Sequence, residues 1–309
     1  MVITLKLSED IIKKMDDFYK DSKRDKTPQY AKFQADSEDT VVTAYESGKV
    51  VFQGISADID SNMWKEMELH NHPDAHPETK KKDKDKEKQK DVYNHRISVT
   101  STIGSDEVGT GDYFGPIIVT ASYVEPKDFE FLNNLGVRDS KKLDDAKIAS
   151  IVPEIIKRIP YTTLKLSNKE YNEQVNLGYN MNQIKAIMHN KVLTDLHTKY
   201  NPEFTVVDQF CLPVLYFKYL KGSNNVWRKI EFTPRAEDKV LSVACSSLIS
   251  RYVFLKEMKN MSKELGINIP LGASTEVDKA AEEVIKKYGV DKLKEVVKYN
   301  FKNTQKVVI

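Results

Sequence analysis

Short stretches of alternating apolar and polar residues dominate the first 70 residues. Apolar residues recur at positions 3, 5 and 7, which predicts a half-buried strand. Ser8 suits a helix N-cap, and the apolar residues after it fall on one helical face. Three further strands and a second helix are predicted at residues 30–35, 40–45, 49–53 and 57–69. This β-α-β-β-β-α order predicts a small α+β domain with its own core.

From about Tyr93 the predicted elements become longer, and strands alternate with helices. The predicted strands are residues 97–103, 117–124, 161–166, 204–208 and 228–232. The predicted helices are residues 144–158, 180–200, 240–265, 277–288 and 291–299. Gly266 marks the end of the longest helix. Such alternation predicts an α/β sheet covered by helices.

A charged segment separates the two patterns. Positions 80–90 hold seven lysines and no apolar residue, so this stretch cannot bury surface, although it could follow a phosphate backbone. We therefore expect domains at residues 1–72 and 93–309, joined by a charged flexible linker at 73–92. His70, His72 and His76 lie close in sequence beside this linker. They leave a metal site open as the alternative to a plain linker.

Composition and charge exclude some classes of protein. The net charge is only +2, and residues 1–72 carry 10 Lys and Arg against 14 Asp and Glu. Only a local basic surface of that domain could therefore meet nucleic acid; the candidates are Lys13, Lys14, Lys20, Lys23, Arg24, Lys26 and Lys32. Cys211 and Cys245 lie in apolar runs and show no C-x-x-C spacing. We therefore expect both to be reduced residues of the core. No targeting segment or membrane-spanning run is visible, so we expect a cytoplasmic protein.

Two adjacent acids, Asp106 and Glu107, stand between two apolar β-branched runs. Next to a buried strand, adjacent carboxylates are costly unless a cation neutralises them. Gly109, Gly111 and Gly115 follow, where the chain can turn tightly and a ligand can approach the backbone. This pattern favours a metal-dependent phosphate-chemistry site, with an acidic hairpin tip as the alternative. The loop lacks the Lys-Ser/Thr pair of a phosphate-binding P-loop.

Asp208 and Glu237 also lie where a strand ends or a helix begins. Acids remote in sequence can converge at the strand ends of an α/β sheet. Clustered carboxylates favour Mg²⁺ or Mn²⁺, and two such ions can activate a water for phosphoryl displacement. One difficulty is local: neighbours on a strand point to opposite faces, so Asp106 and Glu107 share a site only if the strand ends or bulges between them. His189 and His197 lie on the predicted helix 180–200. We expect each to be either hydrogen-bonded within the fold or exposed, rather than to act as a general base.

Three sequence blocks resemble the type 2 ribonuclease H superfamily, in particular bacterial ribonuclease HIII. They are residues 106–116 (DEVGTGDYFGP), 139–143 (DSKKL) and 234–244 (PRAEDKVLSVA). The resemblance implies a ribonuclease H-like α/β fold and endonucleolytic cleavage of the RNA strand of RNA–DNA hybrids, leaving 3′-hydroxyl and 5′-phosphate ends. It also implies two Mg²⁺ or Mn²⁺ ions, with Asp106, Glu107, Asp208 and Glu237 as catalytic and metal-binding residues. The small N-terminal domain is similar to the TATA-binding-protein-like domain with which type HIII holds substrate.

By the same resemblance, the backbone of Gly109, Thr110 and Gly111 would approach the ribose, and Ser140, Lys141 and Lys142 would contact phosphates. Type HII has Arg where Thr110 stands, so this chain lacks that cation and donor fork. We therefore expect cleavage within runs of ribonucleotides. Incision at single ribonucleotides, as in type HII, and hybrid binding without turnover are the alternatives. The expected partner is the RNA–DNA hybrid, with a monomeric chain, no protein partner and no membrane.

Overall fold

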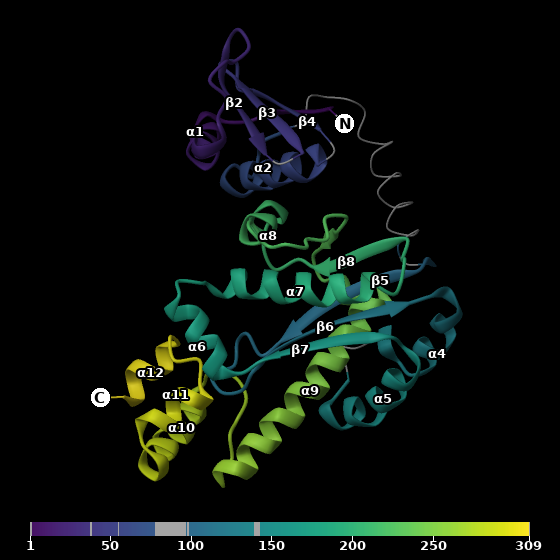
Figure 1. Ribbon diagram of the computed structural model, residues 1–309, viewed down its shortest axis with the longest axis vertical. Helices are drawn as coiled ribbons and strands as arrows, with labels where there is room; N and C mark the ends of the chain where they lie inside the picture. Colours follow the sequence, from purple (N-terminus) through teal and green to yellow (C-terminus); the bar gives the residue numbers. More distant parts are fainter. Residues whose placement is uncertain are drawn as a thin grey trace. The chain divides into compact units, whose positions relative to one another are not determined.

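The computed structural model describes residues 2–37, 39–54, 56–77, 97, 99–138 and 143–308. They form two compact units. The first takes in the described residues before position 93 together with 212–215, and the second takes in the others. Figure 1 draws the main part of the first unit in purple and blue, and the second from teal to yellow.

The first unit is a four-stranded antiparallel sheet with two helices. The strand order is β1-β4-β3-β2. The elements are β1 (Val2–Lys6), α1 (Glu9–Phe18), β2 (Ala31–Ser37), β3 (Thr40–Tyr45), β4 (Lys49–Gly54) and α2 (Ala57–Asn71). The predicted β-α-β-β-β-α order is therefore present, and the small β-rich N-terminal domain is confirmed.

Alternation along the strands decides which face of this sheet the helices cover. Inward residues such as Leu5 and Phe52 form one buried cluster with Ile11 of α1 and Trp64 of α2. The Trp64 Nε1–H donates to the hydroxyl of Tyr19 (3.0 Å), which satisfies the buried indole. The residues between the inward ones point to the other face, and neither α1 nor α2 packs on that face.

The second unit contains a five-stranded mixed sheet in the order β7-β6-β5-β8-β9. The strands are β5 (Thr102–Val108), β6 (Ile117–Val124), β7 (Tyr161–Leu166), β8 (Phe204–Asp208) and β9 (Glu231–Thr233). Strands β5, β8 and β9 run parallel to one another, whereas β6 and β7 pair antiparallel. The predicted strand at 97–103 is wrong. Ile97 and Val99 lie outside β5, which instead runs through the acid pair.

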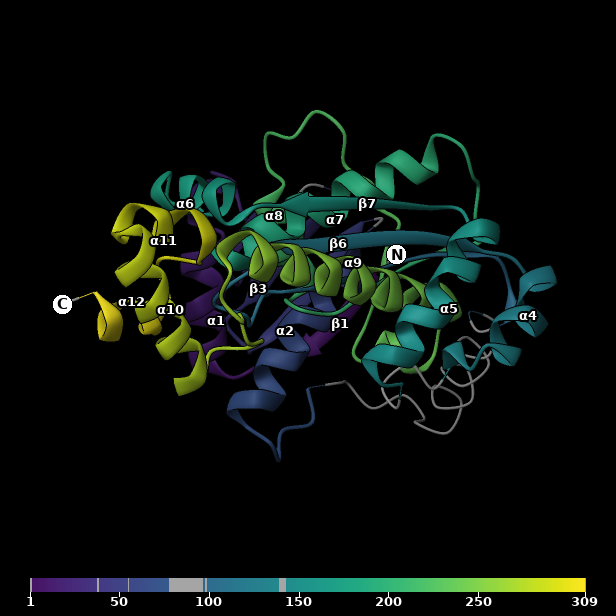
Figure 2. The same ribbon diagram turned by 90° about the horizontal axis from the view of Figure 1, so that it is seen from below.

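Helices cover both faces of this sheet (Figure 1). On one face lies α7 (Met181–His197), whose Ile184 and Leu193 pack with Ile103 and Val119. On the other lie α9 (Leu241–Leu265) and α5 (Asp145–Arg158), which share a second apolar cluster. Further helices in the described part of the chain are α4 (Phe129–Asn134), α6 (Asn168–Asn176), α8 (Pro213–Tyr219), α10 (Thr275–Tyr288), α11 (Val290–Val296) and α12 (Lys302–Val307). In Figure 2, α9 crosses the sheet with α5 near one end and α10 to α12 near the other.

A row of small residues lets α9 approach the sheet closely. Ser242, Ser246 and Ser250 follow one another at a spacing of four, on the face of α9 that meets β5 and β6. Ser246 Oγ donates to the carbonyl of Gly104 (2.8 Å). A Cβ on Gly104 would lie 2.5 Å from the backbone nitrogen of Val243, so this position admits only glycine. This packing fixes the strand that carries the acid pair.

Candidate active site

The carboxyl ends of the three parallel strands bring the predicted acids together. Strand β5 pairs with β8 as far as Ser105 and Val207, so Asp106 and Asp208 are the next residues on neighbouring strands. Glu237 lies on the short 3-10 helix η4 (Ala236–Asp238) that follows β9. The amide N–H of Ala236 donates to Asp208 Oδ1 (2.8 Å) and ties η4 to the end of β8. Three segments far apart in sequence therefore meet at one edge of the sheet.

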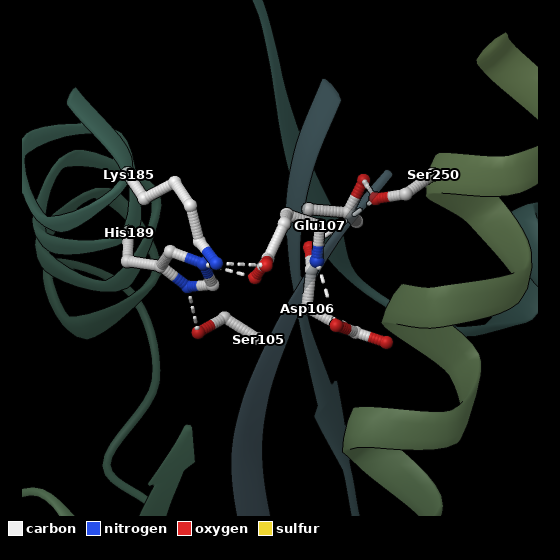
Figure 3. Close-up of polar contacts among 7 residues, drawn as sticks. Ser105, Asp106, Glu107, Lys185, His189 and Ser250 are labelled. Atoms are coloured by element: carbon white, nitrogen blue, oxygen red, sulfur yellow. Dashed lines mark hydrogen bonds and ion pairs between the residues drawn. The ribbon is translucent and has the colours of Figure 1, made fainter. Parts of the chain in front are cut away.

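Glu107 is held by two cationic or hydrogen-bonding side chains of α7 (Figure 3). Its Oε1 forms an ion pair with the Nζ of Lys185, and its Oε2 lies 2.9 Å from His189 Nε2. Burial acts to raise the pKa of Glu107, but the His189 hydrogen bond and the Lys185 charge outweigh it and lower the pKa. Glu107 is therefore a carboxylate whose charge is already compensated.

Asp106 has the opposite surroundings. It is buried, and its Oδ1 accepts a hydrogen bond from the Glu107 amide (2.7 Å). Burial, then the nearby charge of Glu107, raises the pKa of Asp106 to about 8, and the charge of Asp208 acts in the same direction. Burial also raises the pKa of Asp208, with the charges of Glu237 and Glu107 adding to it. The acids therefore lie within electrostatic reach of one another.

The strand neither ends nor bulges between Asp106 and Glu107 on its β6 side. The register is continuous there, with Asp106 opposite Thr120 and Glu107 opposite Val119. Figure 3 shows the two side chains leaving β5 on different sides, Glu107 toward α7 and Asp106 away from it. Accordingly, within the described ranges no three His, Cys, Asp or Glu side chains are already arranged as metal ligands.

The glycine-rich loop after β5 is fixed by a buried lysine. Lys298 has no exposed surface, and its Nζ donates to the carbonyls of Asp112 (2.8 Å) and Gly115 (2.6 Å). Gly109 has φ +93°, and a Cβ there would lie 2.1 Å from the carbonyl oxygen of Pro116. Gly111, in contrast, is exposed with open space around its Cα. Thr110 between them is half-buried.

Several predicted positions fall elsewhere. Ser140, Lys141 and Lys142 lie outside the described residues, as does the lysine run. His72 Nε2 lies 3.0 Å from Asp10 Oδ1, a contact within the first unit rather than among the histidines. His197 stacks on Trp227 with ring centroids 3.4 Å apart, and it has a structural role.

Sequence reasoning missed Lys185 and Phe210, and it did not connect His189 to the acids. Lys185 and His189 stand four residues apart on α7, and both are buried in a helix face that also carries apolar residues such as Ile184 and Met188. Two polar residues at that spacing on a buried helix face signal a shared polar partner. The partner itself, Glu107, is visible only in the fold.

A model of the ribonuclease HII family matches residues 103–304, and a model of a domain of unknown function (DUF3378) matches residues 2–77. A ribonuclease HIII from Bacillus licheniformis is 41% identical to the chain over 307 residues, covering 98% of the chain and 96% of the relative. A ribonuclease HIII from Bacillus mycoides is 39% identical, with the same shares covered. The chain belongs to the ribonuclease HIII family.

Solved structures agree with membership of the ribonuclease HIII family. The crystal structure of Bst-RNase HIII in complex with Mn²⁺ is 33% identical, with a TM-score of 0.69, and covers 100% of this chain and 98% of that one. Ribonuclease H2 from Pyrococcus horikoshii, 22% identical with a TM-score of 0.57, covers 67% of this chain and shares the fold. The predicted ribonuclease H-like fold and enzyme class are confirmed. No helix in the described part of the chain is long and apolar enough to cross a membrane.

Proposed function

We propose that this ribonuclease HIII family member cleaves the RNA strand of RNA–DNA hybrids endonucleolytically, with Mg²⁺ or Mn²⁺, and leaves 3′-hydroxyl and 5′-phosphate ends. The observation that carries the proposal is the placement of Asp106, Glu107, Asp208 and Glu237 at or just after the carboxyl ends of three neighbouring parallel strands. The named activity of the relatives and the Mn²⁺ in the Bst-RNase HIII structure support it.

The four carboxylates fit a hard divalent cation. They offer oxygen ligands only, which Mg²⁺ and Mn²⁺ prefer. Burial and the charges of neighbouring acids raise the pKa values of Asp106 and Asp208, and among the described residues neither carboxyl forms an ion pair with a positive charge. Two cations bound there would supply it, generate a nucleophilic water and stabilise the leaving oxygen. We assign these four residues as the metal-binding and catalytic set.

Substrate contacts are proposed for two neighbouring segments. The backbone of Gly109, Thr110 and Gly111 would meet the ribose, and the open space at Gly111 supports close approach. Ser140, Lys141 and Lys142 would contact phosphates. Thr110 offers no cation to a lone ribonucleotide, so the enzyme is expected to prefer runs of ribonucleotides.

An end-labelled RNA–DNA hybrid tests the proposed activity on a denaturing gel. Wild-type protein should cut the RNA strand with Mg²⁺ or Mn²⁺ and not with EDTA, and Asp106→Asn should cut no faster than background while still binding hybrid. Binding without any cutting would favour the non-catalytic alternative. Efficient incision of a DNA duplex that carries one ribonucleotide would favour the type HII alternative. Full activity of Asp106→Asn would reject the metal role.

We propose further that residues 1–72 hold the hybrid and that residues 73–92 serve as a charged linker. The face of the first unit's sheet that its helices leave uncovered supports this, because Lys6, Lys49 and Gln34 alternate with inward residues and so point to it. Lys13 and Lys14 lie instead on α1, the helix on the opposite face. Deleting residues 1–72 should raise the KM for hybrid more than it lowers kcat; an unchanged KM would contradict this.

The proposed function also includes an oligomeric state and a location in the cell. We propose a cytoplasmic monomer whose partner is the hybrid and which needs no protein partner. A single species at the monomer mass in light scattering, with and without hybrid, is the expected result. A dimer would contradict it.

A further inference from the structure

We propose that Lys185 is a resident counter-cation of Glu107 that competes with the divalent cation, and that His189 is a positioning residue that holds the same carboxylate in place. This inference rests on the proposed cation site. It assigns opposite effects on metal affinity to two neighbouring side chains of α7. Glu107 therefore binds a metal at the expense of an existing ion pair.

The ion pair is enclosed by protein. Lys185 is 7% exposed, the Glu107 side chain 12%, and His189 has no exposed surface. Water therefore screens this pair little, and the Lys185 charge acts strongly on anything bound at Glu107. Each carboxylate oxygen accepts one partner, Oε1 from Lys185 and Oε2 from His189.

Lys185 and His189 are themselves held in place by Phe210. The Lys185 Nζ lies 4.0 Å from the centroid of the Phe210 ring, and the His189 ring stacks on the same ring at 5.1 Å. Phe210 stands two residues after Asp208. Phe210 therefore connects Lys185, the counter-cation of Glu107, to the segment that follows Asp208 at the end of β8.

His189 is oriented by a second hydrogen bond. Its Nδ1 lies 2.8 Å from Ser105 Oγ, and Ser105 shares a face of β5 with Glu107 because the two are two residues apart. A carboxylate has no proton to give, so Nε2 is the donor to Glu107. With Nε2–H donating to Glu107, the other ring nitrogen, Nδ1, faces the Ser105 hydroxyl. His189 thus orients the carboxylate through hydrogen bonds at both ring nitrogens, whereas Lys185 places an ammonium beside it.

Metal affinity separates these two roles. A divalent ion bound at Glu107 is repelled by the Lys185 ammonium in the same poorly screened pocket. Removing the ammonium should strengthen metal binding, whereas removing an orienting hydrogen bond from a ligand weakens it by roughly 10-fold or more. A purely structural role for Lys185 predicts the reverse, since loss of its ion pair would loosen Glu107.

The test is Mn²⁺ titration of the full-length protein without nucleic acid, with free Mn²⁺ followed by electron paramagnetic resonance. Lys185→Met should bind Mn²⁺ about 10-fold more tightly than wild type and should melt at a lower temperature in EDTA. Lys185→Arg keeps the cation and should restore wild-type affinity. His189→Leu should bind more weakly. Lys191→Met removes the same charge from an exposed pair with Asp195 on the same helix and serves as the matched control.

Each outcome decides a separate point. Unchanged or weaker Mn²⁺ binding by Lys185→Met would overturn the inference, and Lys185→Gln gives the same decision if the Met variant does not fold. Tighter binding by Lys191→Met to the same degree would also overturn it, because any charge on α7 would then suffice. If wild type binds no Mn²⁺, or binds it equally well as Asp106→Asn, then the proposed metal site itself fails.

Discussion

Asp106 and Glu107 are neighbours in sequence, yet their surroundings differ in kind. Glu107 turns toward α7 and meets Lys185 and His189, and its pKa is lowered despite burial. Asp106 turns the other way, and burial together with the charge of Glu107 raises its pKa to about 8. The end of β5 thus carries one acid, Glu107, whose negative charge is balanced by Lys185, and one, Asp106, that forms no ion pair among the described residues.

The difference shows where this fold leaves charge unbalanced. On the α7 side the protein supplies its own cation, Lys185, so the acid contributes to stability. On the other side, no ion pair to Asp106 or Asp208 is formed within the described part of the chain, and the acids repel one another. Strain of this kind is expected where a protein keeps a functional site at some cost in stability. The uncompensated side is where a divalent cation would gain most.

Replacing Glu107 is expected to have the largest effect on stability. Glu107→Gln removes the carboxylate that Lys185 needs and leaves a buried ammonium without its counter-charge. Such changes cost about 3 kcal/mol of unfolding free energy or more. Urea unfolding in EDTA measures the loss, and the hybrid gel should show no cleavage. An unchanged unfolding free energy would mean that the α7 side is not compensated as described.

Asp106→Asn is the matched variant, one residue away. Above pH 8, where Asp106 is ionised despite its raised pKa, the substitution removes one of the repelling charges and keeps an oxygen that can accept the Glu107 amide N–H. The unfolding free energy in EDTA should rise by about 1 kcal/mol, although cleavage is lost. If both amide variants lose similar stability, the contrast between the two acids disappears.

Much of the fold follows from local pattern. The strands predicted at 40–45, 117–124, 161–166 and 204–208 match β3, β6, β7 and β8, and the longest helix ends before Gly266, which has φ +59°. The helix α6 was missed because it carries few apolar residues; Ser167 and Glu170 form its capping box instead. The short helices α8 and α12 were missed for want of a long periodic pattern.

The same polar residues explain why β5 was predicted too early in the sequence and why its contacts at the site were not foreseen. The pattern placed the first strand of the second unit too early, because Ser105, Asp106 and Glu107 are polar. In the fold they occupy β5, where side chains from α7 and the backbone satisfy them. A sequence shows that four acids stand at the ends of elements, but it does not show which of them already has a cation. That depends on contacts between β5 and α7, whose residues lie about 80 positions apart.

Lys298 extends the comparison to a buried lysine whose hydrogen-bond partners are backbone carbonyls in place of a carboxylate. Burial lowers the pKa of Lys298 to about 7. Below pH 7 the folded and unfolded chains both carry this proton, and folding bears the full cost of burying the charge. From pH 7 to about 10.4, the ordinary lysine value, the unfolded chain binds more protons, so the unfolding free energy rises with pH.

Lys298→Met removes both this pH dependence and the two hydrogen bonds to the glycine-rich loop. The advantage of wild type over the variant should therefore grow between pH 7 and pH 10 and reach about 1–2 kcal/mol, measured by urea unfolding. Lys302→Met changes an exposed lysine nearby, and its difference from wild type should stay flat over the same range. A difference that shrinks with rising pH would show that Lys298 keeps its charge in the fold, and that carbonyls compensate a buried cation as well as Glu107 does for Lys185.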